Sequence, residues 1–257
     1  MDKKNHMTAK GQKPKKDDNS VVYKVMIALL VLGLSLMGLR SLRQFYSTVG
    51  GMEVLDPMTL WIMIGGFAAG AIVVVVDVLV KNKISRMILP WVAVVGFLVG
   101  LTGLSMRTSW TQGFPMLYFL CFAILAQYII LQLYRWEFFL FSLSTMAAGA
   151  TFLAYHTGFG GKPWGVVTLI ISVCLLVAIA LVTHYACSNH GMLVLGKKHI
   201  TLFPAKSNPL LIYLVVALWM VCIVATIILG GAFAYYCMFA AIAVELIGGV
   251  YYTFQLN

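Results

Sequence analysis

Long apolar runs, each about as long as a membrane-spanning helix, follow one another along this chain of 257 residues. A helix needs roughly 20 consecutive apolar residues to cross a bilayer core of about 30 Å. We therefore predict an all-α fold, a polytopic transmembrane helical bundle of eight spans. The predicted spans are residues 21–39, 58–80, 87–106, 116–134, 138–157, 164–186, 209–229 and 232–254.

The first span follows a basic region, which is also typical of a signal peptide. The run from Gly33 to Met37 leads directly into Arg40 and Arg43, with no small-residue cleavage site. We therefore expect an anchor that is not cleaved.

The boundary between the last two spans depends on a pair of glycines. A single helix over 210–254 would be about 67 Å long, more than twice the thickness of the hydrocarbon core. Gly230 and Gly231 predict a tight reversal there, because glycine adopts the backbone angles that such a turn demands. The alternative is seven spans with an external C-terminus.

The composition agrees with a membrane protein. Apolar residues make up 61% of the chain, charged residues 10%, and the mean hydropathy is +0.94. A soluble domain carries about 25% charged residues, so a water-soluble enzyme is excluded. The five cysteines are odd in number and lie mostly in apolar runs, which gives no sign of a disulfide framework.

Lysine and arginine are distributed unequally between the two sides of the predicted bundle. Of the 18 positive residues, 14 fall on the side that holds the N-terminus and four (Arg40, Arg43, Arg107 and Lys162) on the other. Positive residues concentrate on the cytoplasmic side of membrane proteins. We expect both termini in the cytoplasm and the protein in the cell membrane.

The polar N-terminal segment differs from the rest of the chain. Residues 1–20 form a lysine-rich tail that we expect to be disordered, and residues 21–257 a single membrane domain. The net charge of +10 resembles that of a nucleic-acid-binding protein, but seven of the positive residues lie in the first 24 positions. We interpret the tail as a topology signal rather than a nucleic-acid site; the alternative is a tether to anionic lipid or an acidic partner.

One stretch outside the predicted spans has the pattern of regular secondary structure. The predicted cytoplasmic loop 187–208 contains two short apolar runs about Gly196, which predict a β-hairpin over 192–203. An isolated hairpin is marginally stable in water. We therefore expect this hairpin to lie against the membrane face or a protein partner.

Small residues indicate where helices pack closely. Gly66 and Gly70 in the second span, Gly96 and Gly100 in the third and the run 147–150 in the fifth let backbones approach. We expect these three spans to form the interior of the bundle. The sequence leaves the oligomeric state open.

Ionisable residues inside the spans are the candidates for chemistry, because a charge at bilayer depth is costly unless it is paired or hydrated. Glu245 lies roughly 20 Å and 14 Å from the two ends of the eighth span. It is either a proton or cation carrier or a structural acid bonded to a neighbour such as Gln127, the mid-span amide of the fourth helix. Asp77 lies near the inner end of the second span, where we expect a salt bridge to Lys81 or Lys83.

A histidine and cysteine cluster ends the sixth span. His184, Cys187 and His190 recur at steps of three, which on a helix places them on one face as a weak metal signature. We favour polar residues at a membrane exit and predict no cofactor. Haem is excluded, because His156 and His184 lie at opposite ends of their spans, about 30 Å apart.

Two functions remain open. The first is a permease for a small solute or an ion, with Glu245 and Gln127 as coupling or contact residues. The second is a noncatalytic scaffold or assembly subunit that recruits a protein partner through loop 187–208 or the basic tail. The spans hold no serine, histidine and acid at matching depth, so the sequence favours a protein that is not an enzyme.

Overall fold

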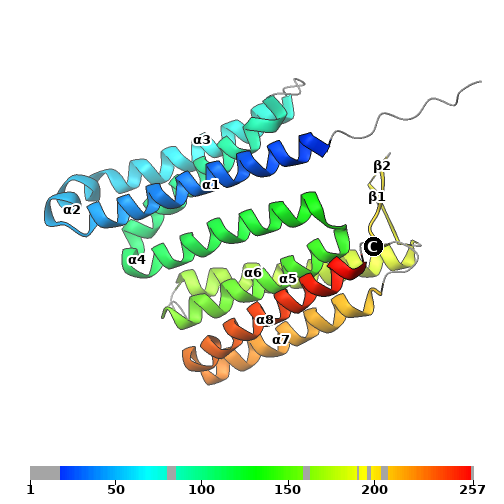
Figure 1. Cartoon of the computed structure of the whole chain (residues 1–257). Coiled ribbons are helices and arrows are strands. Elements are labelled where there is room, and N and C mark those ends of the chain that lie inside the picture. Colours follow the sequence, from blue (N-terminus) through cyan, green and yellow to red (C-terminus); the bar gives the residue numbers. More distant parts are fainter. Residues whose placement is uncertain are drawn as a thin grey trace, which may run out of the picture.

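The protein is a multi-pass membrane protein with eight helices long and apolar enough to cross a bilayer among the residues that the structure describes (Figure 1). A computed structural model describes residues 18–79, 85–158, 163–189, 191–195, 198–203 and 208–255. The helices and strands are α1 (Asp18–Tyr46), α2 (Val49–Leu55), η1 (Asp56–Met58), α3 (Thr59–Leu79), α4 (Ser85–Leu133), α5 (Trp136–His156), α6 (Pro163–Ser188), β1 (Met192–Leu195), β2 (Lys198–Thr201), α7 (Leu210–Leu229) and α8 (Gly231–Gln255). The prediction of eight spans is confirmed, and most of the tail 1–20 lies outside the described residues.

The third and fourth spans belong to one helix, α4, and not to two helices joined by the expected loop 107–115. The helix nevertheless reverses direction, as Figure 1 shows. A Cβ atom added to Gly113 would lie 2.5 Å from Cβ of Ser105, whereas residues eight apart in a straight helix are about 12 Å apart. Pro115 has no amide hydrogen to donate, and the reversal falls between two separate spans, Ile88–Thr108 and Gly113–Leu133.

The first two spans are joined by a capped turn. Helix α1 continues to Tyr46, past the predicted end at residue 39, so Arg40 and Arg43 lie within the helix. Thr48 is the N-cap of α2, and its hydroxyl accepts a hydrogen bond from the amide of Gly51 at 3.1 Å. The Tyr46 hydroxyl donates to Oδ1 of Asp56 at 2.9 Å and ties the end of α1 to η1.

The predicted reversal between the last two spans is confirmed. Gly230 has φ of 81°, in the left-handed region that favours glycine, and its amide donates to the carbonyl of Thr226. Helix α8 then starts at Gly231. The chain therefore returns across the membrane, and the seven-span alternative is wrong.

The predicted hairpin over 192–203 is also present, as β1 and β2, paired antiparallel from Met192 with Thr201 to Leu195 with Lys198. Its base is fixed to the bundle: the amides of Leu202 and Phe203 both donate to the carbonyl of Gly191, and both side chains are buried. In Figure 1 the strands extend beyond the helices, at the end of the bundle that also holds the start of α1 and the C-terminus.

The buried apolar side chains form two clusters. One joins α1 with both halves of α4, and the other joins α5, α6, α7 and α8 with Ile130 of α4 and with Leu202 and Phe203. Helix α5 packs against α4, α6, α7 and α8. Of its most apolar stretch, 67% is buried, compared with 11% to 33% for the other seven spans. Helix α5 is thus the centre of the C-terminal half.

Glycines bring α3 and α4 into close contact, as their spacing predicted. A Cβ atom on Gly66 would lie 2.3 Å from the amide nitrogen of Gly100, and one on Gly96 would lie 2.9 Å from that of Gly70. However, only 17% of the α3 span is buried. The expectation that the second span lies in the interior was wrong, because its small residues serve one contact with α4 while the rest of the helix faces outward.

Candidate functional site

Glu245 lies on α8 and is directed at the central helix α5. The residue as a whole is half-buried, yet both of its carboxylate oxygens are shielded and neither has a hydrogen-bond partner within the described chain. The hydroxyl groups of Ser142 and Thr145 on α5 are polar groups that face it. Among the described residues with shielded, unpartnered side-chain oxygens, Glu245 is the one with both carboxylate oxygens in this state.

Gln127 reaches the same place from the second half of α4. Its Nε2 donates a hydrogen bond of 2.7 Å to Oγ of Ser142, and its Oε1 is shielded without a partner in the described residues. The direct bond to Glu245 that the sequence suggested does not form. Instead, Ser142 lies between the amide and the acid, and its hydroxyl proton remains available to the carboxylate.

A second hydroxyl connects the cluster to α7. Trp219 is fully buried, and its Nε1 donates to Oγ1 of Thr145 at 3.3 Å. The Thr145 hydroxyl donates in turn to the carbonyl of Phe141 at 3.3 Å. Four helices therefore contribute to one buried polar cluster, made of Gln127, Ser142, Thr145, Trp219 and Glu245.

Close packing places α8 against this cluster. A Cβ atom on Gly248 would lie 2.3 Å from Cε1 of Phe141, and the ring of Tyr252 lies 5.1 Å from that of Phe138. Glycine at 248 allows the ring of Phe141 to approach the α8 backbone. Because residues 245, 248 and 252 lie on one face of a helix, this contact also directs Glu245 at α5.

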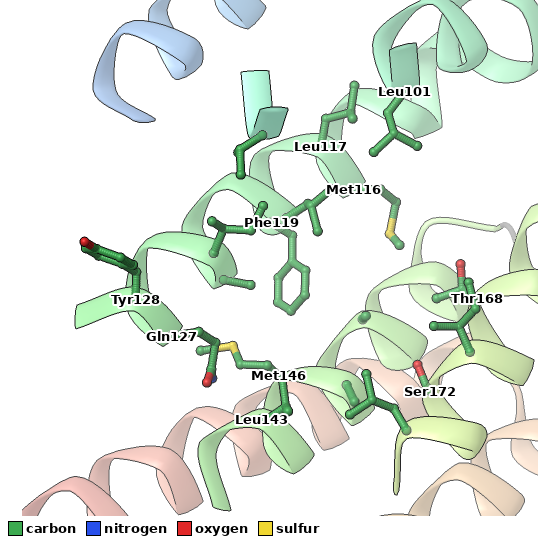
Figure 2. Close-up of a pocket in the computed structure, with 18 of the residues that line it drawn as sticks. Leu101, Met116, Leu117, Phe119, Gln127, Tyr128, Leu143, Met146, Thr168 and Ser172 are labelled. Carbon is green, nitrogen blue, oxygen red and sulfur yellow. The ribbon is translucent and has the colours of Figure 1, made fainter. Parts of the chain in front are cut away.

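A cavity of about 1040 Å³ lies between α4 and the helices α5 and α6, beside the polar cluster. Figure 2 shows its apolar walls, formed by leucine, methionine and phenylalanine side chains from these helices. Thr168 and Ser172 of α6 and Gln127 of α4 are among its few polar residues. Its volume is at the upper end of the range for small-molecule sites, about 300 to 1,000 Å³.

Gln127 belongs to both features, since it lines the cavity and donates to Ser142 of the polar cluster. A molecule in the cavity would contact the amide of Gln127. Ser142 lies between this amide and the carboxylate of Glu245. The arrangement can therefore link occupancy of the cavity to the state of the buried acid. The sequence placed Gln127 and Glu245 in mid-span, and the structure brings them to the same serine.

Asp77 lies near the end of α3 and is half-buried. Its Oδ1 has no hydrogen-bond partner in the described part of the chain. The expected salt bridge involves Lys81 or Lys83, and both lie outside the described residues. The salt bridge to Asp77 therefore stays a prediction.

The histidine and cysteine cluster is only partly described. His184 and Cys187 are exposed near the end of α6, and His190 lies outside the described residues. Within the described ranges, no group of three or more histidine, cysteine or acidic side chains is placed to hold a metal ion. The weak metal signature of His184, Cys187 and His190 therefore stays untested.

Sequence reasoning missed a buried acid, Glu137. It lies in the first turn of α5 with only 1% of its surface exposed. It follows Arg135 and Trp136, directly before the fifth predicted span, and was not singled out from the sequence. The favourable field of a helix N-terminus for negative charge was the available signal, but its burial results from packing that the sequence does not show.

No protein-family model matches the chain, and comparison with curated proteins and with solved structures finds no similar protein.

Proposed function

We propose that the protein is a permease for a small solute or an ion, with Glu245 as the group that takes up and releases a proton or cation. The observation that carries the proposal is the pair of shielded, unpartnered carboxylate oxygens in the middle of the bundle, within the described chain. Buried polar groups in proteins are almost always hydrogen-bonded. An acid without hydrogen-bond partners is suited to binding a proton or a cation reversibly.

A purely structural role explains the geometry less well. A structural acid stabilises a bundle through hydrogen bonds to its neighbours, and an unsatisfied one costs stability. The Ser142 and Thr145 hydroxyls lie close to Glu245, but neither forms a hydrogen bond of good geometry to its carboxylate. Thr145 donates instead to the carbonyl of Phe141, and Ser142 accepts from Gln127 and keeps its own proton. Binding of a proton or cation would compensate for the cost.

The cavity between α4, α5 and α6 supplies space for the transported solute in this proposal. A solute that contacts Gln127 would change the hydrogen bond from Gln127 to Ser142 and thereby affect Glu245. The close glycine contact of α3 with α4 would let these helices shift as a pair. In this proposal the protein acts in the cell membrane, with both termini in the cytoplasm, as the distribution of lysine and arginine predicts.

The test compares Glu245→Gln with wild-type protein reconstituted in liposomes, with an internal pH dye and cation-sensitive dyes as readouts. Glu53→Gln is the matched control, because Glu53 is an exposed acid on α2 outside the cluster. We expect a proton or cation flux in wild type and Glu53→Gln, and at least a tenfold lower flux in Glu245→Gln. Wild-type protein without any flux, or an equal flux in Glu245→Gln, would contradict the proposal.

The second candidate function is a scaffold, and the hairpin of β1 and β2 favours it. Its base is anchored by the buried Leu202 and Phe203, while its strands extend from the bundle (Figure 1). Edge strands offer backbone groups that can pair with a partner strand. Deleting 193–200 should then remove proteins that co-purify with wild type; an unchanged set would count against the scaffold.

A further inference from the structure

A small pocket lies beside the C-terminal part of α1, away from Glu245 and the large cavity. It has a volume of about 500 Å³ and is lined by Arg40, Arg43, Gln44, Ser47 and Tyr118. Four of these residues belong to or directly follow α1, and Tyr118 comes from the second half of α4. All five side chains carry hydrogen-bonding groups, and two are cations.

The donors around this pocket are free in the described part of the chain. The side chains of Arg40, Arg43, Gln44 and Tyr118 form no hydrogen bond or ion pair with any described residue. Ser47 differs, because its hydroxyl donates to the carbonyl of Gln44 at 2.6 Å. The pocket therefore gathers two guanidinium groups, an amide and a phenol that lack acceptors.

The nearest acids along the chain do not neutralise these arginines. Glu53 of α2 and Asp56 of η1 follow α1 directly, and Asp56 instead accepts from the Tyr46 hydroxyl at 2.9 Å. No ion pair joins either acid to Arg40 or Arg43 within the described residues. The positive charge at this end of α1 is therefore uncompensated.

The position of the arginines makes an anionic ligand favourable. Arg40 lies six residues before the end of α1, roughly 9 Å along the helix axis. Helix α1 has 29 residues and is about 43 Å long, longer than a hydrocarbon core of about 30 Å, so both arginines can lie at the level of the lipid headgroups. Arg40 and Arg43 are three residues apart and thus neighbours on one helix face, so both can contact the same anion.

We propose that Arg40, Arg43, Gln44 and Tyr118 form a binding site for a phosphate group. Guanidinium groups match the geometry of phosphate oxygens and bind them through two parallel hydrogen bonds. Gln44 and Tyr118 donate to the remaining oxygens. The phosphate belongs either to a phospholipid headgroup or to a soluble anion, and the site does not depend on transport through Glu245.

The experiment measures binding to purified protein in a neutral detergent. Isothermal titration with inorganic phosphate probes a soluble anion, and native mass spectrometry with phosphatidylglycerol, against phosphatidylcholine, probes a headgroup. Wild-type protein should bind phosphate or retain phosphatidylglycerol, and the double variant Arg40→Gln with Arg43→Gln should bind about tenfold more weakly or worse. Binding of one probe and not the other identifies the source of the phosphate.

Controls separate a built site from a general attraction to positive charge. Arg135→Gln removes an exposed arginine that does not line the pocket and should leave binding unchanged. Tyr118→Phe removes one hydroxyl and should weaken binding while leaving the thermal stability close to wild type, which keeps the proposal testable if the double variant unfolds. Binding of neither probe, or an equal loss in Arg135→Gln, would overturn the proposal.

Discussion

Trp219 and Glu245 belong to the same polar cluster, but one has its hydrogen-bonding group satisfied and the other does not. The indole of Trp219 is fully buried and its one donor is used by Thr145. Glu245 is half-buried, and its two acceptors have no partner in the described chain. We interpret the tryptophan as a structural residue and the acid as a functional one.

Replacing Trp219 with phenylalanine should lower stability without abolishing flux. The change removes one buried hydrogen bond and part of a packed ring, which together cost about 1 to 3 kcal/mol. Thermal unfolding in detergent measures the effect. Trp61→Phe is the control, because Trp61 is 72% exposed, and an equal destabilisation there would contradict the structural role of Trp219.

Replacing Gln127 with leucine should reduce flux more than stability. The leucine keeps a similar volume but cannot donate a hydrogen bond to Ser142. In the proposed mechanism this breaks the link between a solute in the cavity and Glu245. We expect the flux of Gln127→Leu in liposomes to approach that of Glu245→Gln. Wild-type flux in Gln127→Leu would show that the amide takes no part in the coupling.

At the scale of elements, the contact of α3 with α4 depends on glycines at particular positions. Gly66→Val would place a side chain against the backbone of Gly100, which cannot move aside as a flexible side chain would. Overpacking of this kind costs about 1 to 3 kcal/mol or more. Gly65→Val is the matched control, since nothing lies within 4 Å of a Cβ there. Similar melting temperatures for the two variants would contradict this contact.

The sequence predicted the elements better than their contacts. Hydropathy located the eight spans, and Gly230 located the last reversal. It could not show that α4 reverses between the spans Ile88–Thr108 and Gly113–Leu133 with so short a connection, because the close contact of Gly113 with Ser105 is a matter of packing. It also failed to show which helix faces meet. The depths of Gln127 and Glu245 in their spans follow from counting residues. The position of Ser142 between these two side chains, and the burial of Glu137, depend on packing that the sequence does not show.

For the whole molecule, the cavity lies between α4 and the helices α5 and α6. If the protein is a permease as proposed, filling this cavity should stop transport. Ala150 lines the cavity, whereas Ala69 is an exposed residue of α3. We expect Ala150→Trp to lose most of the flux in liposomes while it still folds, and Ala69→Trp to transport normally. Full flux in Ala150→Trp would indicate that the solute takes another path.

The topology of the whole chain gives a further prediction. Eight spans put the two ends of the membrane domain on one side, and the lysine and arginine distribution predicts that this side is the cytoplasm. Reporters that are active only in the cytoplasm should therefore be active before Met1 and after Asn257. Activity of one reporter without the other would require an odd number of crossings.

The central position of α5 has a consequence for biosynthesis. Helix α5 is the least hydropathic of the eight spans and the most enclosed by protein, yet the ribosome delivers it before α6, α7 and α8 exist to cover Glu137, Ser142 and Thr145. A nascent polypeptide that stops at His156 should consequently enter the bilayer inefficiently at this segment, and completing the later helices should rescue its integration.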